Sequence, residues 1–368
     1  MSLVAACLRG DVETLSDLLA AGEPLEARCE EGFTALYTAA AEDDPDAVRC
    51  LIEAGAVVSV GGSPQGATPL MVASENGHLE CVRMLIEAGA DLDMHVSCDA
   101  QPDFDPSAED DPSAEWIPPP LVLAAGNGHQ EVVRILIRAG ADLNIKFGPC
   151  RNSPLHELCA AGRVQMARTL LDADADPSAQ DVDGRSVLFV SCMCDQPECA
   201  ALVLTAGAGI DQPMREPNPG ATPLYVAAMC GHERCVRLLC ENGARINARA
   251  ARGATPMFAS CQEGHLRVVM LLSSYGAART GRWTSENGEQ LTKRAAMFAT
   301  DHGHDEVVRW LEASASYSPL HHVEVLTERR TVELLRGDAC ASYNLRSGRS
   351  IRPMRPRAPF RPPCAPPR

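Results

Sequence analysis

The sequence is poor in aromatic residues and has no long apolar run. Phe, Trp and Tyr make up only 4% of its 368 residues, although 45% are hydrophobic. A core filled by Leu, Ala, Val and Cys suits thin layers of small helices better than one thick globular core. No stretch of 18 or more apolar residues occurs, so we expect no transmembrane helix. The chain opens on an amphipathic pattern at Met1 rather than a secretory signal, which predicts a reducing cytoplasmic or nuclear location for its 16 cysteines.

The sequence also lacks an overall surplus of basic residues. Its formal net charge is −16, which argues against a nucleic-acid binder, because binding the phosphate backbone requires a basic stripe. The charge is uneven. Residues 99–115 hold seven acidic residues and no Lys or Arg, whereas residues 341–368 hold seven Arg, seven Pro and no acidic residue. We expect protein partners, no nucleic acid and no insertion into a membrane.

What the sequence does contain is a repeated tripeptide of the Thr-Pro-Leu type. The intervals between successive copies are 34, 51, 34, 33, 36 and 33 residues. Apart from the 51-residue interval, this is a single period of about 33 residues, as in helical repeat proteins. The first residues of the copies are Thr34, Thr68, Pro119, Ser153, Ser186, Thr222 and Thr255.

Two further anchors follow each tripeptide. A Gly-His pair begins nine residues after the start of four copies, at Gly77, Gly128, Gly231 and Gly264, and a Leu-rich stretch ending in Gly-Ala closes most units. Thr or Ser can cap a helix, Pro fits the first helical turn, and Gly suits a helix end. The pattern predicts a short helix, a turn, a second helix and an extended loop in every unit.

A helix pair of this kind on a 33-residue period resembles the ankyrin repeat. The resemblance implies an all-α solenoid of about nine to ten stacked helix-turn-helix units with β-turn or hairpin loops. It also implies that the recurring His ties neighbouring loops together. Stacking buries the apolar faces that one unit cannot cover alone.

We predict three regions along the chain. The solenoid spans 1–311 and is interrupted at 94–118 by an acidic insertion that we expect to be disordered. Residues 312–340 form either a degenerate terminal repeat or a C-terminal helix pair. Residues 341–368 form a disordered Arg- and Pro-rich tail, in which 356–368 fits a ligand for an SH3-type domain.

The resemblance implies a non-catalytic scaffold or adaptor that binds a partner protein on the concave face and loop tips of the stack. We expect the chain to be a monomer. We further expect a partner with a basic patch opposite the early repeats and an acidic or aromatic feature opposite the late ones. The residues predicted to make contact are Glu42, Glu75, Asn76, Asn127, Phe147, Asp181, Asp183, Arg215, Arg252, Gln262, Glu263 and Trp283.

Several alternatives stay open. Asn144 and Asn247 occupy loop positions that can be hydroxylated in ankyrin proteins, although an Asn also suits a tight loop. Phe104 and Trp116 could form a short docking motif within the insertion. The chain could instead be the substrate-recognition subunit of a ubiquitin ligase with a divergent C-terminal box, although the Leu-Pro-Leu-Pro signature of a SOCS box is absent.

Catalysis and metal binding are disfavoured. A zinc site would need paired Cys-x-x-Cys or Cys/His knuckles, which are absent, so we interpret the cysteines as reduced core residues. At least five of the ten His share one repeat position, which indicates a role in the scaffold rather than in a nucleophile pair. We therefore expect no cofactor, no metal and no enzymatic activity. The cysteines concerned are Cys150, Cys159, Cys192, Cys194 and Cys199.

Overall fold

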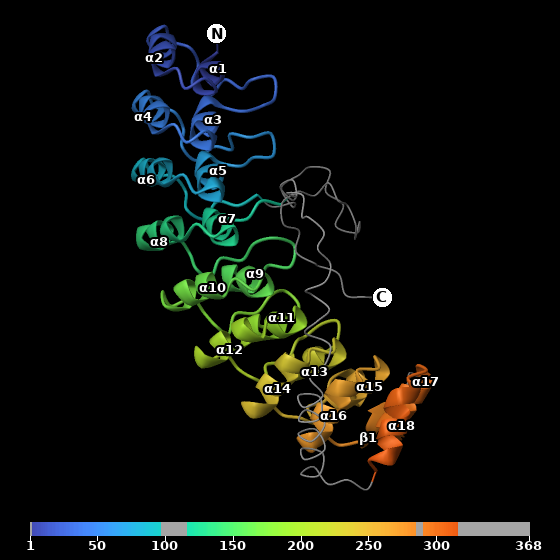
Figure 1. Ribbon diagram of the computed structural model, residues 1–368. Coiled ribbons are helices and arrows are strands. Elements are labelled where there is room, and N and C mark those ends of the chain that lie inside the picture. Colours follow the sequence, from blue (N-terminus) through green and yellow to red (C-terminus); the bar gives the residue numbers. More distant parts are fainter. Residues whose placement is uncertain (1, 97–115, 285–289, 316–368) are drawn as a thin grey trace, which may run out of the picture. The chain divides into compact units, whose positions relative to one another are not determined.

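The computed structural model describes residues 2–96, 116–284 and 290–315, and the chain divides into two compact units, Met1–Gly209 and Ile210–Arg368. We call them unit 1 and unit 2. Both consist of helix pairs joined by extended loops (Figure 1). The prediction of an all-α ankyrin solenoid is therefore confirmed.

Unit 1 has two layers of helices. The first helix of each pair packs on the first helix of the next pair, and most of the second helices do likewise. The loops extend from the first-helix side, away from the second helices (Figure 1). The first helices are α1 (Leu3–Cys7), α3 (Ala35–Ala41), α5 (Pro69–Asn76), α7 (Pro120–Asn127), α9 (Pro154–Ala160) and α11 (Val187–Met193). The second helices are α2 (Val12–Ala20), α4 (Pro45–Glu53), α6 (Leu79–Glu87), α8 (Gln130–Ala139), α10 (Val164–Leu171) and α12 (Pro197–Thr205).

Unit 2 repeats this arrangement. Its last described loop is a two-stranded antiparallel ribbon in which Trp283 lies opposite Leu291. The helices are α13 (Pro223–Met229), α14 (Glu233–Glu241), α15 (Pro256–Gln262), α16 (Leu266–Ser274), α17 (Ala295–Asp301) and α18 (Asp305–Ala313), with the 3₁₀ turn η2 (Ala251–Gly253) and the strands β1 (Thr280–Thr284) and β2 (Gln290–Arg294).

The repeated tripeptide determines where most first helices begin. The Thr68 hydroxyl accepts a hydrogen bond from the backbone N–H of Met71 at 3.3 Å, and Ser186 does the same for Phe189 at 3.1 Å. Each bond satisfies one of the N–H groups that a helix leaves unpaired at its start. Where Gly-His is missing, Asp43 and Asp195 adopt the left-handed conformation with φ of 56° and 53°. Asp tolerates this region better than most residues, so the repeat survives the change.

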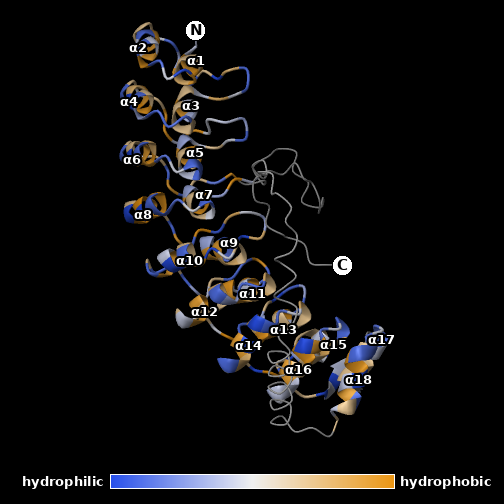
Figure 2. Cartoon of the chain, in the orientation of Figure 1, coloured by the Kyte–Doolittle hydropathy of each residue, from blue (hydrophilic) through white to orange (hydrophobic). Residues whose placement is uncertain are grey.

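The core is a series of leucines from both layers. Leu51, Leu85 and Leu136 of the second helices, and Leu70 and Leu121 of the first helices, are essentially inaccessible to solvent. Each contributes about 1.5–3 kcal/mol through burial. Figure 2 shows apolar residues along the helices and hydrophilic residues gathered at helix ends and on loops. The small Ala residues of the first helices allow the close stacking that the low aromatic content predicts.

Two predicted boundaries are wrong. Val96 and Ile117 exchange backbone hydrogen bonds of 3.0 and 3.1 Å, so the outer residues of the predicted disordered segment 94–118 are paired. Helix α18 ends at Ala313, so the boundary placed at 311 falls inside that helix. Residues 97–115, including Phe104, most of 312–340 and the whole of 341–368 with its SH3-type motif lie outside the described residues. Among the helices that are described, none is both long enough and apolar enough to span a membrane.

Candidate partner-binding surface

A ladder of side-chain hydrogen bonds holds successive loops in register. In each rung, a side-chain oxygen of one repeat accepts the backbone N–H of a residue 31 to 49 positions further along the chain. A rung of this kind contributes about 1 kcal/mol and fixes the spacing of neighbouring loops. The rungs join Glu26 to Val57, Ser59 to Asp91, Asp93 to Asp142, Asn144 to Asp176, Asp211 to Arg245 and Asn247 to Ala278, at distances of 2.8–2.9 Å.

The histidines of the Gly-His pairs form a second link between repeats. The ring of His129 hydrogen-bonds the carbonyl of Glu75 at 2.9 Å, and that of His265 hydrogen-bonds the carbonyl of Met229 at 2.9 Å. The carbonyl in each case lies near the end of the preceding first helix, where no intrahelical donor is available. These bonds confirm the predicted scaffold role of the repeated His. They also hold the ends of the first helices side by side.

Four predicted contact residues lie at these helix ends in unit 1. Glu42, Glu75, Asn76 and Asn127 are all exposed. The amide of Asn127 donates to the carbonyl of Glu75 at 3.2 Å, and the amide of Asn76 reaches the carbonyl of Ala41 at 3.5 Å. The two glutamates therefore present carboxylates on a row whose backbone is tied from one repeat to the next.

The charge of Glu75 reaches a neighbouring side chain. Burial raises the pKa of Tyr37, and the negative charge of Glu75 raises it further. The equivalent region of unit 2 shows the same effect. Burial and the charge of Glu263 raise the pKa of Tyr225, against an opposing hydrogen bond from Asn218. The exposed glutamates at the first-helix ends thus create a local negative field in each unit.

The predicted residues of unit 2 occupy two places. Gln262 is half-buried and Glu263 is exposed at the end of α15, where the carbonyl of Gln262 accepts a hydrogen bond from His304 at 2.8 Å. Arg215 and Arg252 are exposed on loops. Trp283 is half-buried on β1, and its ring meets Phe298 edge-on with centroids 4.9 Å apart.

Two of the predicted loop-tip residues are not at the surface, and this part of the prediction is wrong. Phe147 is only 2% exposed and packs against Trp116, with ring centroids 5.7 Å apart. Asp181 is 7% exposed, and its carboxylate accepts a hydrogen bond from the Nε–H of Arg185 at 2.6 Å. Both residues point back into the base of a hairpin, because side chains alternate between the two faces of an extended segment.

The neighbouring Asp183 is only partly covered. Its carboxylate lies 2.8 Å from Arg185, so one guanidinium spans both aspartates of the hairpin. Trp116, which we considered as part of a docking motif, is half-buried against Phe147 and supports the base of the insertion. The hairpins thus have an ordered base, with exposed residues at their tips.

The two candidate modification sites, Asn144 and Asn247, are exposed, but their side-chain amides already take part in hydrogen bonds. The side-chain oxygens of Asn144 and Asn247 each form one rung of the ladder described above. Their hydroxylation stays a prediction.

Sequence reasoning missed a buried polar cluster at the start of α9. His156 is inaccessible to solvent, contacts the Ser153 hydroxyl at 2.7 Å and hydrogen-bonds the carbonyl of Arg185 at 3.1 Å. Burial lowers the pKa of His156 to about 4, so the ring is neutral near pH 7. The adjacent Glu157 accepts from the Asn152 amide at 2.7 Å, and burial raises the pKa of its carboxyl. Because solvent cannot reach the Ser–His contact, it joins the hairpin to α9 rather than forming a nucleophile.

Of the five cysteines considered for zinc, Cys159, Cys192 and Cys199 are buried in helices, whereas Cys150 lies in a hairpin turn and Cys194 follows the end of α11. Cys159 and Cys199 are buried and hydrogen-bonded to each other, and this bond together with burial raises the pKa of Cys159. In the parts of the chain that the structure describes, no three His, Cys, Asp or Glu side chains are grouped as metal ligands.

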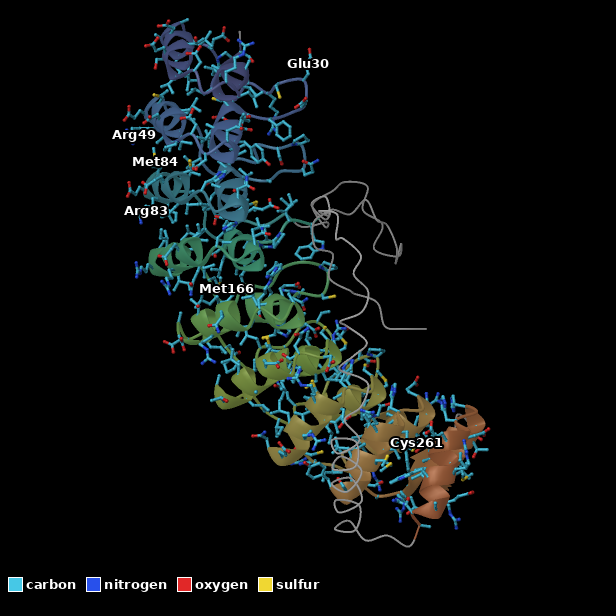
Figure 3. All side chains as sticks on the ribbon, in the orientation of Figure 1. Glu30, Arg49, Arg83, Met84, Met166 and Cys261 are labelled. Atoms are coloured by element: carbon cyan, nitrogen blue, oxygen red, sulfur yellow. The ribbon has the colours of Figure 1, made fainter. Side chains whose placement is uncertain are left out.

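The sign of the loop charge differs between the units. The unit 1 segments 22–33, 55–67, 89–118, 141–152 and 173–185 carry eighteen acidic and four basic residues, and eleven of the acidic residues lie outside 99–115. The unit 2 segments 210–221, 243–254 and 276–293 carry four acidic and seven basic residues. Figure 3 shows Glu30 at the tip of a unit 1 loop, whereas Arg49 and Arg83 lie on the second helices α4 and α6.

Comparison with known proteins identifies the repeat. A family model described as ankyrin repeats in three copies matches residues 3–95, 104–181 and 173–250. Ankyrin repeat and SOCS box protein 16 of Homo sapiens is 34% identical over 92 residues, which are 25% of this chain and 20% of that protein. Ankyrin repeat domain-containing protein 37 of Bos taurus is 29% identical over 91 residues, 25% of this chain and 58% of that protein. Regulatory protein NPR6 of Arabidopsis thaliana is 38% identical over 71 residues, 19% of this chain and 15% of that protein.

The chain covers less than two thirds of the length of each of these relatives. The family model, in contrast, covers well over half of this chain. Ankyrin repeats are protein-interaction modules, and the helix pairs, the linking histidines and the loop ladder are all present in the structure. The chain belongs to the ankyrin-repeat family.

Proposed function

We propose that this chain is a non-catalytic adaptor that binds a partner protein on the surface formed by its first helices and loops. The observation that carries the proposal is the row of exposed polar residues, including Glu42 and Glu75, on helix ends that are tied together by hydrogen bonds. Such a row is rigid before binding, so a partner does not have to pay the entropy of ordering it.

The electrostatics of unit 1 support a partner with a basic patch. The exposed first-helix ends are acidic, and the loops beside them carry a large excess of acidic residues. Charges of one sign on a fixed surface steer a complementary partner and exclude like-charged ones. The second helices carry both signs, with pairs such as Arg49–Asp46 at 3.6 Å.

A charge swap tests the surface assignment. We expect Glu42→Lys/Glu75→Lys to weaken capture of the main partner by about tenfold or more, because it reverses the charge of the row. The matched control is Glu53→Lys/Glu87→Lys, which changes the same charge in the same two repeats, but on the exposed second helices. Affinity purification with quantitative mass spectrometry measures both pairs. Equal losses from the two pairs would show that the first-helix surface is not the binding site.

A second candidate function is substrate recognition in a ubiquitin ligase. The observation in its favour is the similarity to a human protein whose name includes a SOCS box. Co-purification of this chain with elongin B/C and a cullin would support it, and their absence from a purification that recovers the main partner would exclude it.

We propose that the chain resides in the cytoplasm or nucleus, in keeping with the free cysteines of the described residues.

A further inference from the structure

The loops of unit 2 expose arginines at equivalent positions of successive repeats. Arg249 and Arg282 are 33 residues apart, one repeat period, and both are exposed. Each lies one position before an inward-facing residue: Ala250, which is buried, and Trp283, which packs on Phe298. The alternation of an extended segment therefore directs both arginines outward.

The ribbon adds a third arginine to the same side. Arg282 lies opposite Thr292 and Arg294 lies opposite Thr280, so the two arginines are diagonal neighbours on one face of the β1–β2 pair. Diagonal positions of this kind are about 7–8 Å apart. The opposite face holds Gly281 and Trp283 and packs toward Phe258 and Phe298. The outward face is basic, and Arg294 is exposed like Arg282.

Close backbone contacts hold these loops at a fixed spacing. A Cβ atom added at Gly220 would lie 2.9 Å from the carbonyl oxygen of Arg249, and one added at Gly253 would collide with the carbonyl oxygen of Arg282. Each loop therefore rests directly on the backbone beside the next arginine. Because helices of neighbouring repeats pack about 8–10 Å apart, Arg249 and Arg282 are separated by about the same distance.

We propose that Arg249, Arg282 and Arg294, which we call the arginine row, bind an extended acidic peptide segment of a partner protein. The inference rests on the proposed function and names the partner chemistry for unit 2. Acidic side chains at every third residue of a polyproline II segment lie on one side and about 9 Å apart, which matches the spacing of the row. Planar guanidinium groups favour such carboxylates, because they can form two parallel hydrogen bonds with each.

The arginine face of the ribbon carries no large apolar side chain among the described residues. Leu291 is 41% exposed, but it stands opposite Trp283 and therefore lies on the other face of the ribbon from Arg282 and Arg294. The neighbours of the two arginines on their own face are Thr280 and Thr292, so the bound segment is recognised through its charge. A peptide fits this surface better than a nucleic acid does, because the body of the chain is acidic and would repel a long phosphate backbone.

The test uses the full chain and a defined probe. The probe is a fluorescent peptide with Glu at every third residue and Pro elsewhere, and its binding is followed by fluorescence anisotropy at low salt. We expect Arg249→Glu/Arg282→Glu to weaken binding by about tenfold or more. The affinity of the unchanged chain should fall steeply as the salt concentration rises, because salt shortens the Debye length and screens the charges. Leu291→Ser should leave binding within about twofold of the unchanged chain, because Leu291 lies on the opposite face of the ribbon.

The control pair is Arg168→Glu/Arg267→Glu, which makes the same charge change at exposed positions on the second helices α10 and α16. This pair should bind the probe within about twofold of the unchanged chain, since it leaves the row intact. Circular dichroism of each variant checks that the fold is retained. No binding of the probe, equal losses in both pairs, or tighter binding of oligothymidylate would overturn the inference. Because the probe is synthetic, these results are independent of the partner purification described above.

Discussion

The loops of unit 1 and unit 2 carry opposite charge on the same framework. In both units a side-chain oxygen of one repeat accepts a backbone N–H of the next, as Asn144 and Asn247 illustrate. In both, a His ring joins the ends of adjacent first helices. Yet acidic residues dominate the first set of loops and basic residues the second. The framework thus depends on a few positions that face inward or cap helices. The positions that face outward can therefore carry either acidic or basic residues.

The difference separates the residues that maintain the stack from those available for recognition. Asp181 and Arg185 bear charges but belong to the first group, because they pair at the buried base of a hairpin. Glu75 and Arg249 belong to the second group, because they are exposed on repeats whose spacing is fixed by other residues. Four experiments test this separation.

The largest difference in stability cost between equivalent substitutions in the two units should come from their ion pairs. In unit 1 the side chains of Arg185 and Asp181 are 17% and 1% exposed, whereas in unit 2 those of Arg245 and Asp211 are 81% and 20% exposed and lie 3.5 Å apart. Arg185→Ala should cost about 3–5 kcal/mol, since it leaves a buried carboxylate without its partner. Arg245→Ala should cost below about 1 kcal/mol. Urea denaturation measures both, and equal costs would contradict the assignment of Arg185 to the framework.

The second experiment compares two loop glycines with positive φ. Gly253 of unit 2 has φ of 85° and a Cβ there would meet the backbone of Arg282, whereas Gly66 of unit 1 has φ of 87° and a Cβ there would lie 3.6 Å from Val96. Gly66→Ala should cost about 1–2 kcal/mol for the left-handed conformation alone. Gly253→Ala should cost about 3 kcal/mol because a backbone must also move.

Hydrogen exchange of the backbone amides in each unit shows where the stability lost in Gly66→Ala and Gly253→Ala resides. Gly253→Ala should speed exchange in β1 and α15, where the displaced loop packs. If the two variants are equally stable, the loops of unit 2 are not held as closely as the arginine row requires.

The third experiment uses acid to distinguish the units. The pKa of His156 falls from its ordinary value near 6.5 to about 4 in the folded chain because the ring is buried. The folded state therefore holds fewer protons than the unfolded state, so stability is complete above pH 6.5 and is lost as the pH falls toward 4. The loss should reach about 3 kcal/mol. Denaturation midpoints between pH 7 and 4 measure it, with hydrogen exchange showing that it arises in unit 1.

Two variants separate the contributions to this pH profile. His156→Gln should flatten the acid loss, whereas His302→Gln, at an exposed position of unit 2, should leave it unchanged. Glu157 acts in the opposite direction, because burial raises its pKa and protonation then favours the folded state. Glu157→Gln should therefore steepen the loss on acidification. A profile that His156→Gln does not alter would exclude His156 as its source.

The smallest effects concern the shared ladder. Asn144→Ala and Asn247→Ala each remove one rung, at 2.9 and 2.8 Å, and should each cost about 1 kcal/mol. The two costs should agree, because the framework is the same in both units. Asn76→Ala, which removes a 3.5 Å contact, serves as the control and should cost less. Unequal costs for the two rungs would indicate that the units differ in their framework as well as in their charge.

The helices could be predicted from the sequence because their ends carry their own signals. Thr68 caps α5 through its own side chain, and Gly77 ends the same helix in the left-handed conformation. These interactions are local, so a tripeptide and a Gly nine residues later are enough to predict them. The role of His129 followed from its recurrence in phase with the repeat.

The loops were harder to predict because their side-chain directions depend on hairpin register. Phe147 and Asp183 both lie in extended loops, yet one is buried and the other is partly exposed. A shift of one residue in the pairing would exchange such positions, and no period in the sequence fixes it. The contact between Trp116 and Phe147 joins residues on either side of a full helix pair, so it requires the folded stack. The arginine row could be found from Arg249 and Arg282 once equivalent positions were aligned.

The rungs of the ladder all run in one direction, from an oxygen on the earlier repeat to an N–H on the later one. A repeat that carries a rung oxygen can therefore precede any repeat whose loop offers the matching N–H, whatever the original place of the two repeats in the chain. Such modules can be duplicated, lost or exchanged by recombination, and each new junction can form its rung. A chain assembled in this way can lengthen its acidic stretch or its basic stretch independently, and so acquire new ligands by adding copies rather than by redesigning a site.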